Sequence, residues 1–266
     1  MENTAFDYKR IAEGYKKRPF LHKQVIERFQ KDICGQRFTC GLDIGCGAGL
    51  STKALKIICN QAIGSDISSE MVSVAREVCQ LDKDISFIVS RAENIPVTIP
   101  KIDIVTAAGA IQWIDRETFL KNIRNVMAEN GYMLIYDFAI SDQMLQNEAY
   151  TGWWHEKYLK EFPKPFRNEH KWTQEDVTEY GFTILDQISY EMEYEFDLAS
   201  FIEFMMIQSN VNAKIEGEGR KIDEVSEWFR KTLGNIFVKP KETVIFRGYS
   251  WYFRKSNETF YKKDRN

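Results

Sequence analysis

The stretch LDIGCGAGL at residues 42–50 most strongly constrains how this chain folds. A short, β-rich apolar run at residues 38–44 ends at Gly45, and glycine recurs at Gly47 and Gly49, before a helical spacing of apolar residues. Glycines let a ligand approach the backbone, and a helix N-terminus offers free N–H groups and the positive end of a dipole. The pattern therefore predicts a strand, a cofactor-binding turn and a helix. Its spacing is G-x-G-x-G, not the G-x-G-x-x-G of dinucleotide folds.

An acidic residue further along supports this interpretation. A second strand-like run at residues 62–65 ends at Asp66, about 21 residues after Gly45, the distance expected of a ribose-binding acid in a βαβ nucleotide fold. The alternative is that Asp66 caps the next helix, but Ser68 and Ser69 are better placed for that role.

Charge and cysteine content limit the function classes. The 266 residues carry a net charge of −3, so no basic field attracts nucleic acid or an anionic membrane. The five cysteines lie in the first third, are odd in number and form no C-x-x-C, which is typical of a reduced protein with buried thiols. No apolar run has membrane-spanning length, and the N-terminus lacks a signal-peptide core. We therefore expect a cytoplasmic protein without nucleic-acid or membrane partners; its oligomeric state stays open.

Strand-like and helix-like segments alternate through the first half of the chain. The expected strands are 38–44, 62–66, 85–89, 102–107 and 132–138, and the expected helices include 20–30, 70–79 and 117–127. We expect Asp115 to cap the last of these helices and Asn130-Gly131 to end it. The alternation predicts an α/β fold with a doubly wound, mostly parallel sheet and ligands beyond the carboxyl ends of its strands. His22, on the first helix, is expected at the surface or partly buried and not as a ligand.

The pattern changes between residues 140 and 172, where aromatic residues gather and prolines interrupt the helix. These residues are Trp153, Trp154, Tyr158, Phe162, Phe166 and Trp172, with Pro163 and Pro165. We interpret the segment as a helical cap inserted after the fifth strand. A satellite hydrophobic cluster without a ligand is the alternative, because aromatic content alone mostly reflects packing. Further strands are expected at 183–196 and 243–253, and further helices at 198–208 and 222–233.

Several segments resemble motifs of the class I S-adenosylmethionine (SAM) dependent methyltransferases. LDIGCGAG and GSDISSEMVSVAR resemble motif I and the acidic loop after it, SRAENIP at 90–96 resembles the adenine-binding segment, and IDIVTAAGAIQWID at 102–115 resembles the fourth strand and its turn. FIEFMMIQSNV at 201–211 is similar to a helix of the trans-aconitate methyltransferase branch, within the methyltransferase type 11 group. The adenine segment departs from the family at Arg91, where an Asp is common.

The resemblance implies SAM as the cofactor and a seven-stranded Rossmann-like sheet with an antiparallel hairpin at its edge. It implies a SAM-binding core with N-terminal lid helices at 1–139, an inserted aromatic cap at 140–182, and completion of the sheet by 183–266. For the segment before Arg18-Pro19, a loosely packed helix is the alternative to a lid. The implied cofactor residues are Asp43, Gly45, Cys46, Gly47, Gly49, Asp66, Ile67, Met71, Arg91, Ala92, Glu93 and Ala108.

Methyl transfer needs few reactive side chains, because the sulfonium methyl of SAM is already electrophilic and the protein mainly aligns a nucleophile with it. The chain has no G-x-S-x-G and no His/Cys cluster with metal spacing, so we expect no metal and no nucleophile–base triad. Gln112 and Trp113, after the fourth strand, are candidates for the acceptor site. His155 is a candidate base, and Arg167 and Arg18 are candidates to hold an acidic substrate, although solvated surface roles remain open for all three.

We interpret the chain as a SAM-dependent methyltransferase of a small-molecule acceptor. The trans-aconitate branch suggests O-methylation of a carboxylate. The alternatives are N- or C-methylation of a larger metabolite, a NAD(P)-binding oxidoreductase, and a SAM-binding regulatory protein without activity. The glycine spacing and the aromatic cap favour SAM over a nicotinamide cofactor.

Overall fold

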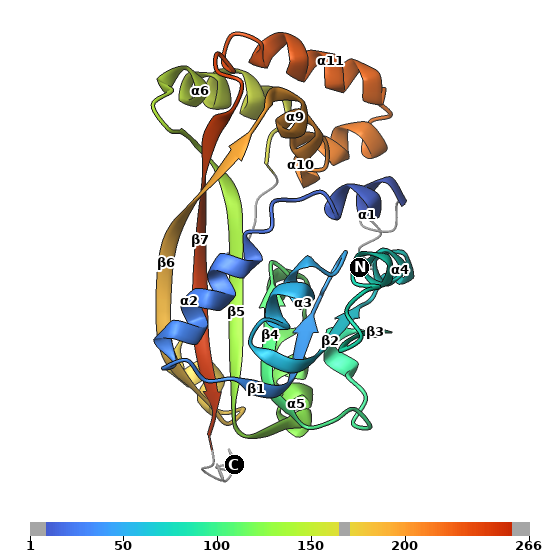
Figure 1. Ribbon diagram of the computed structural model, residues 1–266, viewed down its shortest axis with the longest axis vertical. Helices are drawn as coiled ribbons and strands as arrows, with labels where there is room; N and C mark the ends of the chain where they lie inside the picture. Colours follow the sequence, from blue (N-terminus) through green and yellow to red (C-terminus); the bar gives the residue numbers. More distant parts are fainter. Residues whose placement is uncertain (1–8, 165–170, 257–266) are drawn as a thin grey trace, which may run out of the picture.

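The computed structural model describes residues 9–164 and 171–256, and its centre is a seven-stranded sheet of order β3-β2-β1-β4-β5-β7-β6 (Figure 1). Strands β1 to β5 are parallel, and β7 runs antiparallel between β5 and β6. This confirms the expected mostly parallel α/β sheet with an antiparallel hairpin at one edge. The strands are β1 (Phe38–Ile44), β2 (Cys59–Asp66), β3 (Ile85–Val89), β4 (Ile102–Ala108), β5 (Met127–Met144), β6 (Phe182–Phe196) and β7 (Glu242–Lys255).

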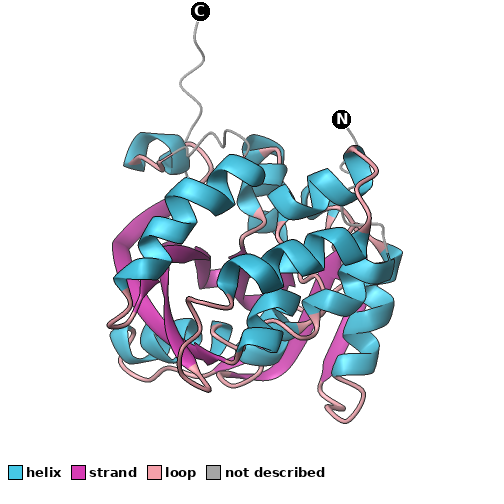
Figure 2. Ribbon diagram, turned by 90° about the horizontal axis from the view of Figure 1, so that it is seen from above, coloured by secondary structure: helices cyan, strands magenta, loops and turns pink. Residues whose placement is uncertain are grey.

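Helices cover both faces of the sheet (Figure 2). Alternate residues of a strand point to opposite faces, so Leu134 of β5 packs with α2, whereas Met133 packs with α5. The helices around the sheet are α1 (Lys9–Tyr15), α2 (His22–Asp32), α3 (Leu50–Leu55), α4 (Ser69–Val78), α5 (Arg116–Val126) and α8 (Gln174–Thr178). Short 3₁₀ turns at Ala92–Asn94 and Ile111–Trp113 follow β3 and β4.

Side-chain caps place the beginnings of these helices. The Ser68 hydroxyl accepts from the backbone N–H of Met71 at 3.3 Å, and the Asp115 carboxylate accepts from that of Thr118 at 2.9 Å, as the sequence predicts. The expected end of α5 at Asn130 is wrong. The helix ends at Val126, because Met127 already pairs with Ile102 of β4.

Two groups of helices lie beyond the carboxyl ends of the parallel strands and are called here the helical cap (Figure 1). The first group is α6 (Glu148–Trp153), a π-helical turn (Trp154–Tyr158) and α7 (Leu159–Glu161). The second group is α9 (Leu198–Met206), α10 (Ser209–Asn212), a π-helical turn (Ala213–Gly217) and α11 (Ile222–Leu233). The rings of Phe162 and Phe229 stack across the two groups with centroids 5.4 Å apart.

Asn210 connects the two groups of the cap by hydrogen bonds. Its side-chain oxygen accepts from the Tyr158 hydroxyl at 3.0 Å, and its side-chain nitrogen donates to the Phe162 carbonyl at 2.6 Å. Asn210 is buried, so both bonds are made away from bulk water. Segments that are far apart in sequence therefore form one cap.

The described aromatic residues of segment 140–172 do not form the single cluster that the sequence predicts. Strand β5 continues to Met144, and the cap helices begin only at Glu148. Trp172 lies on the face of the sheet that α5 covers, in one cluster with Phe119: its ring centroid is 5.4 Å from that of Phe253, which pairs with Met133 of β5. The Arg116 guanidinium lies 4.5 Å from the Trp172 ring centroid. Aromatic composition alone does not specify which of several apolar surfaces a ring covers.

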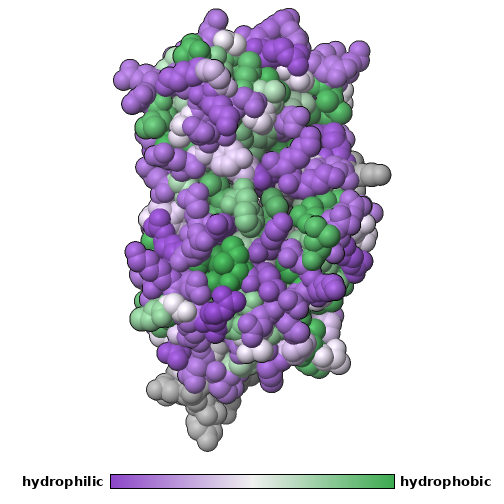
Figure 3. Space-filling view, viewed as in Figure 1, coloured by the Kyte–Doolittle hydropathy of each residue, from purple (hydrophilic) through white to green (hydrophobic). Residues whose placement is uncertain are grey.

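The surface seen in Figure 3 is mostly hydrophilic, with apolar patches near mid-height. Within the described ranges, no helix combines the length and the apolar character that crossing a membrane requires. Four of the five cysteines are buried, and Cys34 is exposed.

Candidate cofactor and acceptor site

A cavity of about 630 Å³ lies where the carboxyl ends of the parallel strands face the helical cap. Its wall combines the glycine loop, the ends of β2 and β4, the middle of β5, the segment between α1 and α2, and residues of α9 and α10. This volume falls in the range of pockets that enclose a small-molecule ligand, roughly 300–1,000 Å³. The position agrees with the expected ligand site beyond the strand ends.

The glycine loop brings backbone directly to the cavity. Gly45 and Gly47 line it with φ angles of +64° and +50°, a region that side chains other than glycine rarely adopt. A Cβ atom on Gly45 would lie 2.5 Å from the Cβ of Ala110. Glycine at residue 45 is therefore required both by conformation and by space.

Asp66 ends β2 and lines the same cavity. Its two carboxylate oxygens accept from the backbone N–H groups of Gly47 and Ser68, each at 2.9 Å. These bonds fix the carboxylate relative to the glycine loop and to the start of α4. The acid and the loop are thus one rigid unit.

The predicted cofactor residues divide into two sets. Nine of them line the cavity: Gly45, Gly47, Asp66, Ile67, Met71, Arg91, Ala92, Glu93 and Ala108. Asp43, Cys46 and Gly49 lie outside its wall. Gly49, with a φ angle of +87°, instead precedes the first residue of α3.

Asp43 has a structural position beneath the loop. It is fully buried, and its carboxylate accepts hydrogen bonds from the hydroxyls of Ser51, Thr52 and Thr106 at 2.6, 2.7 and 2.8 Å. Burial raises the pKa of Asp43 to about 6, against the lowering effect of these hydrogen bonds. The residue joins β1, α3 and β4 and so holds the strand–turn–helix unit together.

The acceptor candidates also divide. Gln112, Trp113 and Arg18 line the cavity, and the Gln112 side-chain nitrogen donates to the Gly109 carbonyl at 3.0 Å. His155 does not reach the cavity wall; its Nε2 lies 2.9 Å from the Asp142 carboxylate in an exposed ion-pair network. Arg167 lies outside the described residues.

Arg18 lies on the cavity wall and carries a buried hydrogen-bond donor, its Nε, without a described acceptor. Its Nε is buried and has no hydrogen-bond partner among the residues that the structure describes. Its guanidinium lies 3.7 Å from the ring centroid of Tyr15, and this ring passes 3.9 Å from where a Gly47 Cβ would lie. The Tyr15 ring, with Arg18 against it, thus lies beside the glycine loop.

Sequence reasoning missed two residues of the cavity wall. His22 and Tyr136 both line it, and His22 Nδ1 lies 2.9 Å from the Tyr136 hydroxyl oxygen. The pattern placed each residue in its element, one in a helix and one in the fifth strand. It carried no signal that the two side chains meet, because the residues are far apart in sequence.

Comparison with known proteins agrees with this geometry. Residues 42–135 match the family model described as "Methyltransferase domain", which contains the glycine loop, Asp66 and the end of β4. Residues 42–135 therefore form a methyltransferase domain of the class I SAM-dependent type. A probable SAM-dependent methyltransferase of Saccharomyces cerevisiae is 26% identical over 168 residues, 62% of this chain and 57% of that protein.

Two further similarities are informative about fold and family. A malonyl-[acyl-carrier protein] O-methyltransferase of Hamiltonella defensa is 25% identical over 134 residues, which are 50% of this chain and 51% of that protein. The structure of a proposed type II methyltransferase from Anaeromyxobacter dehalogenans covers 89% of this chain and 97% of its own with a TM-score of 0.65 at 18% identity, which shows the shared fold. The match spans only about half to three fifths of the length of these curated relatives.

The residues of this domain fit SAM, the cofactor of class I methyltransferase domains. The glycine loop leaves backbone space that a Cβ on Gly45 would fill, and Asp66 presents a fixed carboxylate for two ribose hydroxyls. Ile67 is an exposed apolar residue directly after Asp66, and Met71 lies on the same wall, so the two offer apolar surface for the adenine ring. With Arg91 where an Asp is common, the backbone around Ala92 would complete adenine recognition.

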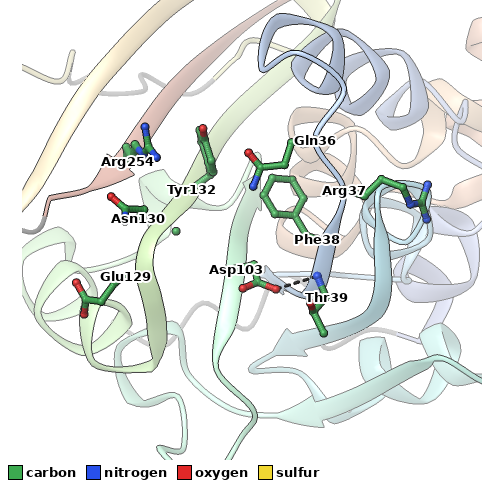
Figure 4. A pocket seen from close by; sticks show the side chains of 10 residues that line it. Gln36, Arg37, Phe38, Thr39, Asp103, Glu129, Asn130, Tyr132 and Arg254 are labelled. Carbon is green, nitrogen blue, oxygen red and sulfur yellow. Dashed lines mark hydrogen bonds between the residues drawn. The ribbon is translucent and has the colours of Figure 1, made fainter.

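A second, smaller hollow of about 220 Å³ lies at the amino ends of β1 and β4 (Figure 4). The Asp103 carboxylate on its wall accepts from the backbone N–H groups of Thr39 and Cys40 at 2.8 and 3.0 Å. Arg37, also on the wall, donates to the Ile57 carbonyl at 3.0 Å. These two side chains hydrogen-bond the backbone of β1 and of the segment before β2, so their role at the hollow is structural.

Proposed function

We propose that the chain transfers the methyl group of SAM to a small-molecule acceptor that carries a carboxylate, forming a methyl ester. The observation that carries this proposal is the buried Nε of Arg18, which has no described partner and lies on the wall shared with the cofactor residues. A guanidinium binds a carboxylate through two parallel hydrogen bonds. Lys164 places a second cation on the same wall.

Methyl transfer to a carboxylate requires the protein only to bind and position the two substrates. SAM supplies an electrophilic methyl group. A carboxylate with an ordinary pKa of about 4 is already ionised at neutral pH, so it needs no general base. The chain's own tasks are to orient the acceptor through Arg18, to hold the cofactor through the glycine loop and Asp66, and to exclude water with the cap and Trp113.

Two observations support a small acceptor. The cap covers the strand ends, so that the acceptor site lies inside a cavity and not on an open surface. The net charge of −3 offers no general attraction for a nucleic acid. One similar protein is named for O-methylation of a malonyl group, which is consistent with an oxygen acceptor.

The proposal is tested by methyl transfer from labelled SAM to panels of carboxylic acids, amines and phenols. We expect ester formation with an acid, and Arg18→Ala should raise the KM for that acid about tenfold, the scale of one charged hydrogen bond. Arg230→Ala removes an exposed arginine of α11 that pairs with Glu227, and it is the matched control with unchanged KM. Turnover of an amine or phenol without any ester would contradict the proposal.

N-methylation of a larger apolar metabolite is the second candidate. It is favoured by Asp137, which lines the cavity and offers a negative charge to an amine. Phe138, Phe204 and Phe246 add apolar surface to the same wall. The amine panel of the same assay distinguishes this reaction from ester formation.

A further inference from the structure

His22 and Tyr136 form a hydrogen-bonded pair that the proposed transfer does not use. His22 is the first residue of α2, Tyr136 lies in β5, and both line the cavity. The 2.9 Å between His22 Nδ1 and the tyrosine oxygen is a good hydrogen-bond distance. The Phe138 ring centroid lies 4.9 Å from that of His22, so apolar surface closes one side of the pair.

Both members of the pair are uncharged at neutral pH. Burial, and then the positive charge of Arg18, lowers the pKa of His22 to about 3. Burial, with the charge of Asp43 adding to it, raises the pKa of Tyr136 well above its ordinary value. The proton between them belongs either to the tyrosine hydroxyl or to Nδ1, and both arrangements are neutral.

The pair has one hydrogen-bonding position left over. Among the described residues, Nε2 of His22 has no hydrogen-bond partner. Nε2 donates when Nδ1 accepts from Tyr136, and it accepts when Nδ1 donates to Tyr136. A ligand hydroxyl satisfies either arrangement, and a ligand carbonyl satisfies the first. The position therefore suits a neutral oxygen group.

The charges on the same wall define the rest of the ligand. The charged groups that share the wall with the pair on the acceptor side are Arg18, Lys164 and Asp137, and the field of Arg18 reaches the His22 ring. We propose that His22 and Tyr136 bind a neutral oxygen of the acceptor while Arg18 binds its carboxylate. The acceptor is then a hydroxy- or oxo-carboxylic acid, an inference that rests on the proposed function.

In this arrangement His22 is a positioning residue and not a base. A proton on His22 would be a second buried positive charge beside Arg18, and a carboxylate acceptor has no proton to release. His22 should therefore contribute no ionisation to the kcat/KM profile for the acid between about pH 5 and pH 8, the interval in which an ordinary histidine titrates. A limb of the profile that disappears in His22→Asn would instead assign base catalysis.

The experiment compares matched acids: a short straight-chain monocarboxylic acid and its hydroxy and oxo derivatives. We measure kcat/KM for ester formation, and in parallel the Kd of each acid by calorimetry on protein saturated with the demethylated product of SAM. The wild type should prefer an oxygen-bearing acid at least about tenfold, because the plain acid leaves Nε2 unpaired. Tyr136→Phe and His22→Leu should reduce this preference to about twofold or less, and His22→Asn, which keeps a polar side chain, should retain part of it.

Unchanged SAM affinity in each variant shows that the fold and the cofactor site are intact. If the wild type shows the same kcat/KM and the same Kd for plain and oxygen-bearing acids, the inference is overturned, although ester formation itself still stands. A preference that survives both Tyr136→Phe and His22→Leu would also overturn it. If no acid is esterified, the proposed function fails, and the binding preference in the calorimetric arm still decides whether the pair recognises the neutral oxygen.

Discussion

Residues 45–108 form the part of the cavity wall called here the cofactor side, and its loop, acid and turn follow the ends of neighbouring parallel strands. The acceptor side combines residues from distant segments: 15–22, 112–113, 136–140, 164, 204–210 and 246. Backbone geometry positions the first side, as in the glycine loop bonded to Asp66. Side-chain contacts between distant segments position the second, as in His22 with Tyr136 and Asn210 with Tyr158.

This difference predicts that substitutions on the two sides of the cavity alter different properties of the protein. Substitutions that add a side chain at a glycine of the cofactor side should strongly weaken SAM binding and change the stability of the cap little. Changes that truncate side chains on the acceptor side should alter substrate preference or cap stability and leave SAM affinity unchanged. The following predictions test this separation.

Gly45→Ala should have the largest effect, a loss of SAM affinity of roughly 100-fold. It combines the strain of a left-handed conformation, about 1–2 kcal/mol, with a Cβ 2.5 Å from that of Ala110. Gly35→Ala is the matched control, because Gly35 has a φ angle of +76° and nothing within 4 Å of an added Cβ. Calorimetry should show normal SAM binding for Gly35→Ala; normal binding for Gly45→Ala would remove the steric argument.

Asn210→Ala should lower the free energy of unfolding by about 2–3 kcal/mol, because it leaves the buried Tyr158 hydroxyl and the Phe162 carbonyl without this partner. SAM affinity should stay within about twofold of wild type. Denaturant unfolding measures the first quantity and calorimetry the second. Gln80→Ala, at an exposed position, is the control, with an expected change within about 0.5 kcal/mol. A large loss of SAM affinity in Asn210→Ala would argue against separable sides.

Asp66→Ala should weaken SAM binding by about 1.5–3 kcal/mol, the scale for losing a charged hydrogen-bond partner. Asp84→Ala removes a more exposed acid that pairs with Lys56 at 3.7 Å and should leave the affinity unchanged. Both dissociation constants come from the same titration. An unaltered Kd in Asp66→Ala would mean that the carboxylate only orders the loop.

Asp43→Asn should flatten part of the pH dependence of stability. The folded protein holds a proton on Asp43 up to about pH 6, whereas the unfolded chain loses it near its ordinary pKa of 3.8. The free energy of unfolding due to this group therefore falls as pH rises from about 4 to 6, by on the order of 2 kcal/mol. His22, with a lowered pKa, contributes the opposite slope in this range, so the variant must be compared with wild type at each pH. If the free energy of unfolding depends on pH in the same way in Asp43→Asn and in wild type, Asp43 does not cause the fall in stability.

The cofactor side was predictable because its signals are local. Glycine at 45 and 47, the end of a strand and an acid at 66 all lie within one βαβ unit, where periodicity and turn chemistry fix the geometry. The acceptor side depends on contacts such as His22 with Tyr136, which local periodicity does not encode. Trp172 shows the same limit: its aromatic character indicated burial, but not that it would pack on Phe253 on the α5 face of the sheet, apart from the other cap aromatics.

We propose that the glycine loop and Asp66 form a SAM site. Calorimetric titration of the wild-type protein with SAM and, separately, with NADH tests this proposal. We expect saturable binding of SAM and of its demethylated product, and no measurable binding of NADH. Tight binding of NADH without binding of SAM would contradict it.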